Sequence, residues 1–171
     1  NVHLLVELFK IKKIIYLDLV PNLYVGTQYL KSFYGDKVID YRETKSREII
    51  EFGTTNDLEI FCIAPQQIDK ITSEIDFFHN AHSFVEMPES VISNYAKKIE
   101  TKLASTNSAI SLVTYASEYP RSHYKSAGDG FDSSTTIHPE KLPLFFTNPA
   151  KKFCFPTLVG NMKSHYHFLI Q

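Results

Sequence analysis

Short apolar runs alternate with amphipathic stretches along the first two-thirds of the chain. Runs of this length, without polar interruption, are typical of strands in a parallel sheet. They lie at 14–17, 37–41, 58–64, 75–79 and 109–115. Apolar residues recur at helical spacing in three other stretches, at 2–9, 21–33 and 89–104. The alternation predicts βαβ units, and so an α/β, Rossmann-like fold with a mainly parallel sheet in a single domain that covers residues 1–171.

Turn-forming residues mark the ends of these elements. Gly35 is suited to the left-handed position that ends a helix, and Gly53 is placed to end a short helix within the charged stretch 42–56. Residues 121–136 are rich in Ser, Gly, Asp and Thr and predict a long loop. We expect a turn at 157–161 and a final strand at 163–170.

Composition excludes several classes of function. The 171 residues carry a formal net charge of −1, so no basic patch indicates a nucleic-acid partner. The opening residues lack the features of a signal peptide, and their apolar run is too short to span a membrane. Both cysteines, Cys62 and Cys154, lie in apolar runs and are predicted to be buried thiols. We therefore expect a cytoplasmic protein with no nucleic-acid partner and no membrane contact.

Ligands of open α/β sheets bind at the carboxyl ends of the strands, so residues that directly follow an apolar run are candidates. Asp18 ends the first run, and a carboxylate there can accept hydrogen bonds from the ribose hydroxyls of a nucleotide-like cofactor. The alternative is that Asp18 is the N-cap of the helix that opens near Pro21. The sequence leaves both roles open.

The loop at 80–88 holds the densest group of polar side chains that follows any run. It offers an amide at Asn80, an imidazole at His82, a hydroxyl at Ser83 and a carboxylate at Glu86. His82 titrates near neutrality and is suited to take a proton from a substrate hydroxyl, whereas Glu86 would need desolvation. The alternative for Ser83 and Glu86 is a capping box at the start of the next helix.

The sequence gives little support for a metal site, for a hydrolytic motif or for a nucleotide-binding motif. His165 and His167 would share one face of a strand, but no pair of cysteines has zinc-finger spacing, so we expect no metal. No G-x-S-x-G elbow and no Walker-type loop occur. The G-D-G at 128–130 is more typical of a surface turn.

Two segments of the chain carry a combination of motifs. One pairs the acid Asp18 and Leu19 with Pro21 and then a helix that contains Tyr29 and Leu30. The other is an N-x-x-S-F-x-E-M loop at residues 80–87. With these two segments the chain resembles the sugar O-methyltransferase family over about residues 10–115, which implies a small-molecule or glycan substrate. The sequence departs from the family at Val20, which is inserted between Leu19 and Pro21.

The resemblance implies a class I methyltransferase that binds S-adenosylmethionine across the ends of its strands. Asp18 would bind the ribose, and the segment of Ala64, Pro65 and Gln66 would lie near the adenine. Asn80 and His82 would flank the methyl donor, and His82 or Glu86 would take the proton of the acceptor hydroxyl. Asp18 and Asn80 are then expected at the same edge of one parallel sheet.

The family also has a glycine-rich loop after a first, central strand, and no glycine precedes Asp18 in this chain. We therefore expect an N-terminally truncated fragment in which the absent strand lies between the strands that end at Asp18 and His79. Unpaired strand edges are costly, so the 171-residue chain is predicted to be poorly soluble or inactive by itself. Two alternatives remain: an NAD-dependent sugar epimerase or reductase, and a non-catalytic module of polysaccharide biosynthesis.

Overall fold

The structure is a computed structural model that describes residues 1–104, 107–115, 139–147, 152–159 and 162–171. The chain divides into two compact units, Asn1–Ser73 and Glu74–Gln171. Each combines helices with a sheet, and three of the five strand pairs are parallel. The α/β class with mainly parallel strand pairing, expected for a Rossmann-like fold, is confirmed.

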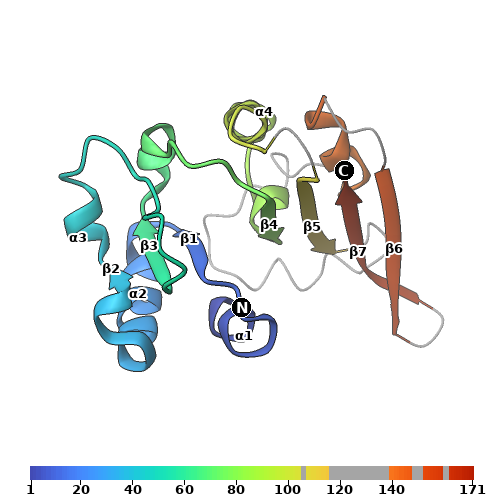
Figure 1. Cartoon of the computed structure of the whole chain (residues 1–171). Coiled ribbons are helices and arrows are strands. Elements are labelled where there is room, and N and C mark those ends of the chain that lie inside the picture. The colour runs from blue at the N-terminus through green and yellow to red at the C-terminus, as the bar shows by residue number, and fades with distance from the viewer. Residues whose placement is uncertain (105–106, 116–138, 148–151, 160–161) are drawn as a thin grey trace. The chain divides into compact units, whose positions relative to one another are not determined.

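The first unit holds a three-stranded parallel sheet with the strand order β1-β3-β2 (Figure 1). Its strands are β1 (Lys13–Leu17), β2 (Val38–Ile39) and β3 (Glu59–Ile63). Its α-helices are α1 (Val2–Phe9), α2 (Val20–Tyr34) and α3 (Tyr41–Thr44), and its 3-10 helices are η1 (Gly35–Lys37) and η2 (Pro65–Lys70). Gly35 ends α2 with a φ of 56°, as its position in the sequence predicts.

The core of the first unit forms between β3 and the inner face of α2. Ile60 and Cys62 of β3 are fully buried, as is Leu23 of α2, and Val2 and Leu5 of α1 pack against this core. Leu23 and Leu30 share one face of α2 and are both buried, so they anchor the helix to the sheet.

The second unit holds a four-stranded sheet with the strand order β4-β5-β7-β6 (Figure 1). Its strands are β4 (Phe77–Ala81), β5 (Ala109–Tyr115), β6 (Lys152–Val159) and β7 (Met162–Ile170). Its helices are η3 (Ser83–Glu86), α4 (Glu89–Glu100) and η5 (Pro139–Phe145). β4 and β5 are parallel, whereas β7 runs antiparallel to both β5 and β6.

The two faces of this second sheet differ in burial. Alternate residues of β5 and β7 are buried, among them Leu112 and Ile170, and so are Ile92 of α4 and Leu142 of η5. The opposite face carries apolar side chains with large exposed fractions, for example Phe155 at 55%. Tyr166, Phe168 and Ile170 of β7 all lie on the buried face.

The described strands form two sheets, which differs from the expectation of one. β1 and β4 are both edge strands, since β1 pairs only with β3 and β4 pairs only with β5 in the described part of the chain. A single sheet would need a further strand that pairs with both edges. These two edges are the ones that the family resemblance places on either side of a central strand, which stays a prediction.

Several local expectations need correction. The turn expected at 157–161 is wrong at its start, because Thr157 lies within β6. The stretch 42–56 forms no helix that ends at Gly53; its helix is the short α3. Cys62 is buried as predicted, but Cys154 is exposed. The loop at 121–136 and the G-D-G at 128–130 lie outside the described residues. None of the helices in the described part has the length and apolar character that a bilayer crossing demands.

Candidate functional site

One group of predicted site residues lies at the carboxyl ends of β1 and β3. Leu17 pairs with Ile63 in the parallel register, so Asp18 and Ala64 follow neighbouring strands. The backbone N–H of Asp18 donates to the carbonyl oxygen of Ile63 over 3.3 Å and extends the ladder by one residue. The structure therefore brings Asp18 next to the start of the segment 64–66.

The carboxylate of Asp18 is held by two local donors. The Tyr16 hydroxyl donates to Oδ2 over 2.9 Å, and the backbone N–H of Leu19 donates to Oδ1 over 2.8 Å. The N-cap of α2 is Leu19 and no side chain caps this helix, so the alternative role of Asp18 as its N-cap is wrong. An ionised carboxylate has about four acceptor positions, so Asp18 retains capacity for a ligand that donates two hydrogen bonds.

Tyr16 connects Asp18 to helix α2. Burial raises the pKa of Tyr16 above its usual value, and the hydrogen bond to Asp18 raises it further, so the hydroxyl remains a donor at neutral pH. Its ring lies against Gly26 of α2, where a Cβ atom would lie 2.5 Å from the ring carbon Cε1. Gly26 is therefore the residue that lets Tyr16 reach Asp18.

We predict that Gly26→Ala destabilises the protein by roughly 1–3 kcal/mol, because the added methyl group forces the Tyr16 ring to move. In a helix without this contact, the same change would stabilise by about 0.5–1 kcal/mol. Chemical denaturation measures the difference, and Ser32→Ala at an exposed position of α2 is the control, expected within about 0.5 kcal/mol of the parent. A more stable Gly26→Ala variant would show that Tyr16 is not held in this position.

A buried chain of hydrogen bonds fixes the backbone that follows β3. The N–H of Ala64 donates to Oε1 of Gln67 over 2.8 Å, and Nε2 of Gln67 donates to Oγ1 of Thr44 over 3.3 Å. The Thr44 hydroxyl in turn donates to the carbonyl oxygen of Cys62 over 2.9 Å. Ala64 is buried and Gln66 is exposed, so Gln66 presents the polar side chain of the segment 64–66 to solvent.

The second group of predicted site residues follows β4. Asn80 uses both of its polar atoms inside the turn: Nδ2 donates to Oγ of Ser83 over 2.6 Å, and Oδ1 accepts from the N–H of Phe84 over 3.3 Å. Asn80 thus shapes the turn. Its predicted place beside a methyl donor stays a prediction.

The alternative of a capping box at Ser83 and Glu86 is not formed. These two residues bound the separate 3-10 helix η3, and α4 begins at Glu89 with Pro88 as an N-cap that makes no side-chain hydrogen bond. Glu86 is exposed to solvent. Its carboxylate is therefore not committed to capping α4.

His82 is the most constrained residue of this group. Its φ is 67°, which is uncommon for a residue other than glycine, and its N–H donates to the carbonyl oxygen of Val113 over 2.7 Å. Its Nδ1 atom is buried and has no hydrogen-bond partner among the described residues. Burial lowers the pKa of His82, and the nearby imidazoles of His165, His167 and His79 lower it further. The ring is therefore neutral at pH 7.

Two aromatic side chains that sequence reasoning did not select as site residues adjoin His82. The ring of Tyr115 lies 4.3 Å from that of His82 and the ring of His165 lies 5.3 Å away, measured between centroids. Tyr115 ends an apolar run, which is the signal that selected the other candidates. His165 carries no local signal, because only the antiparallel pairing of β5 and β7 places it opposite Tyr115.

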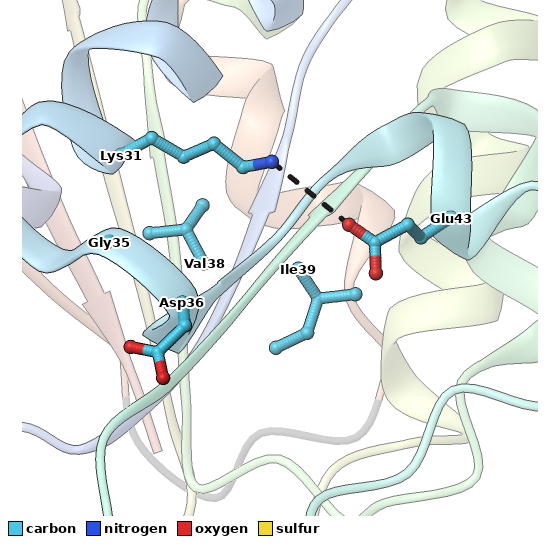
Figure 2. A pocket seen from close by; sticks show the side chains of 6 residues that line it. All are labelled: Lys31, Gly35, Asp36, Val38, Ile39 and Glu43. Atoms are coloured by element: carbon cyan, nitrogen blue, oxygen red, sulfur yellow. Dashed lines mark ion pairs between the residues drawn. The ribbon is translucent and has the colours of Figure 1, made fainter.

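Neither a metal-binding cluster nor a surface hollow indicates a further site among the described residues. Among the described residues, no three His, Cys, Asp or Glu side chains are grouped closely enough to hold a metal ion. An open hollow of about 360 Å³ lies beside β2, and Figure 2 shows its lining, in which Lys31 pairs with Glu43. None of the predicted site residues lines it.

The predicted site residues thus form two groups, each complete within its own unit. Asp18 and the segment 64–66 lie at the edge of the first sheet, whereas Asn80, His82 and Glu86 follow a strand of the second.

No family model and no curated protein matches the chain. Solved structures are similar to it at low identity. The PH0226 protein from Pyrococcus horikoshii OT3 is 14% identical with a TM-score of 0.49, over 98% of this chain and 85% of that chain. Two structures of DhpI, the DhpI–SAM–HEP complex and the DhpI–SAH complex, are each 10% identical with a TM-score of 0.42, over 92% of this chain and 78% and 76% of theirs. Likeness at this level by itself assigns neither a cofactor nor a reaction to this chain.

Proposed function

We propose that this chain belongs to an S-adenosylmethionine-dependent O-methyltransferase that acts on a hydroxyl group of a sugar. The observation that carries the proposal is the place of Asp18, a carboxylate with free acceptor capacity at the carboxyl end of a parallel strand, next to Ala64. Nucleoside-bearing cofactors bind at this position in open α/β sheets, where an acid accepts from the ribose hydroxyls. SAM and SAH are also the ligands named for the two DhpI structures.

The residues divide into two roles. Asp18 binds the ribose, and the segment of Ala64, Pro65 and Gln66 lies along the adenine. Asn80 shapes the turn that carries His82, and His82 or Glu86 takes the proton of the acceptor hydroxyl. Methyl transfer to an oxygen needs the donor carbon and the acceptor in line, so alignment and exclusion of water contribute much of the rate.

Cofactor class is tested by adding S-adenosylmethionine and NAD separately to the complete product of the gene and following its melting temperature. A ligand that binds only the native state raises that temperature, and we expect the rise with S-adenosylmethionine alone. A rise with NAD alone would favour a sugar epimerase or reductase. No rise with either would favour a non-catalytic module.

We predict that Asp18→Asn weakens S-adenosylmethionine binding by about 10- to 100-fold, because it removes a charged acceptor of two hydrogen bonds. Isothermal titration calorimetry measures the affinity. The matched control is Asp36→Asn, which removes an exposed carboxylate of the same unit and is expected to leave the affinity unchanged. Equal affinities of both variants would remove Asp18 from the cofactor site.

A further inference from the structure

Helix α2 carries apolar side chains on the side that is turned away from its sheet. Leu23, Thr27 and Leu30 are its buried residues and define the side that packs on the core. A helix at a protein surface normally presents charged and polar residues on the opposite side. In α2 that side instead holds five apolar residues with exposed fractions of 48–66%, which we call the outer face of α2: Val20, Tyr24, Val25, Tyr29 and Phe33.

The outer face of α2 carries no charge. Lys31 is the only charged residue of α2, and none lies between it and Asp18 in the sequence. Lys31 pairs with the buried carboxylate of Asp40 at 3.2 Å, so this cation is engaged within the first unit. Charged residues are depleted and aromatic residues enriched at the centre of protein–protein interfaces. The composition of the outer face is therefore that of an interface.

The spacing of these residues gives the outer face a regular relief. Val25, Tyr29 and Phe33 follow one another at intervals of four, and so do Val20 and Tyr24. Rows of this spacing form ridges on a helix, and the ridge of one helix packs into the groove beside the ridge of another. The rings of Tyr29 and Phe33 lie 5.0 Å apart and already support each other, which lowers the entropic cost of ordering them in a contact.

The lack of charge narrows the class of partner. A nucleic acid or an anionic membrane surface is held by basic residues, and a charged protein surface by complementary charges. A second copy of the same face needs neither, because no like charges meet when two uncharged faces pair. The five side chains leave roughly 500 Å² open, which is close to the apolar part of the about 800 Å² that each partner contributes to a standard interface.

We infer that the outer face of α2 binds the outer face of α2 in a second copy of this chain, and that the complete gene product is a homodimer. The two helices cross at a two-fold axis, with the ridge of each in the groove of the other. Such isologous pairs are the commonest oligomers of soluble proteins. Tyr29 is the middle residue of its row and so lies near the axis. This inference depends on neither the cofactor nor the reaction proposed above.

Sedimentation velocity of the complete gene product at micromolar concentration tests the inference, and we expect a dimer. Tyr29→Glu places two like charges beside each other at the axis and should give a monomer. Tyr29→Ala keeps a good helix former and should raise the dissociation constant of the dimer roughly tenfold or more. The matched control is Ile49→Glu, at an exposed apolar position of the same unit outside α2, which should remain a dimer. Circular dichroism verifies that each variant is folded.

A charge-pairing experiment separates a second copy from any other partner. Tyr29→Glu and Tyr29→Lys should each be monomeric alone, whereas an equimolar mixture should form a heterodimer, because the two-fold axis brings the opposite charges together. A monomeric parent protein would overturn the inference, and so would a folded Tyr29→Glu variant that remains a dimer. A mixture that stays monomeric would overturn the pairing of one outer face with its own copy.

Discussion

Replacing Asp40 with Asn is expected to lower the free energy of unfolding by roughly 2–3 kcal/mol at neutral pH. Asp40 is 1% exposed, and its carboxylate accepts from the Arg42 guanidinium over 2.9 Å and from Lys31 over 3.2 Å. Its other oxygen accepts from the backbone N–H of Arg42 and caps α3. Asn keeps this cap but removes the negative charge, so both cations lose their buried partner. Urea denaturation measures the change.

The effect should depend on pH in a defined direction. The hydrogen bond from Arg42 holds the pKa of Asp40 well below its usual range, and Lys31 contributes, while burial acts in the opposite direction. A lowered pKa in the folded state stabilises the protein in full above the unfolded value, about 3.9 for Asp, and this stabilisation is lost as the pH falls below it. The difference between the parent and Asp40→Asn should therefore shrink as the pH falls below about 4.

The control for Asp40 is Glu43→Gln on the same helix. The Glu43 side chain is 60% exposed and lies 4.0 Å from Lys31, so its ion pair is largely screened. We expect a change of less than about 0.5 kcal/mol, with little dependence on pH. A similar loss of unfolding free energy in both variants would mean that the buried carboxylate of Asp40 contributes no more to stability than the exposed carboxylate of Glu43.

The cluster around Asp40 also shows why the sequence predicts one part of the fold and not another. β1, α2, β3, α4 and β5 were predicted at nearly their observed bounds, because each has a continuous apolar run or an apolar helical face. Asp40 gave no such signal. Its importance depends on Lys31, nine residues away, and hence on the end of α2 lying beside β2.

Strand β6 was not predicted because its sequence contradicts the usual pattern. It contains Pro156, which disfavours an interior strand, and its side chains at 152–158 are exposed on both faces. The strand exists through its antiparallel pairing with β7 at the edge of the sheet, where proline is tolerated. Pairing of this kind is not encoded in the local pattern.

The candidate site, like the fold, could be predicted only where the local sequence carries a signal. Asp18 and His82 were selected because both follow apolar runs, and their surroundings then excluded two alternative roles, the N-cap at Asp18 and the capping box after His82. The left-handed backbone of His82 and its contact with His165 were not predictable, because both follow from the registers of β5 with its neighbours. The register is a property of the sheet, so only the structure reveals it.

Replacing His82 with Asn is expected to lower the rate of methyl transfer by about 100- to 10,000-fold, the contribution of a positioned base. In the proposed reaction the neutral imidazole accepts the proton of the acceptor hydroxyl, and Asn has no group that can take it at neutral pH. Asn tolerates a positive φ, so the turn after β4 should survive the change. Release of S-adenosylhomocysteine by the complete gene product measures the rate, and His3→Gln serves as the control with unchanged activity.

The same assay separates His82 from Glu86 as the base. With His82 as the base, activity is lost as the pH falls through its pKa, which burial and the neighbouring imidazoles place below the usual value of about 6.5. His165→Gln removes one of these imidazoles, so it should raise the pKa of His82 and move the acid limb of the profile to higher pH, with S-adenosylmethionine affinity unchanged. Glu86 is exposed and is not among the groups that act on His82, so Glu86→Gln should leave this limb in place. If Glu86→Gln abolishes turnover while His82→Asn retains it, the base is Glu86 and the buried Nδ1 atom of His82 serves binding alone.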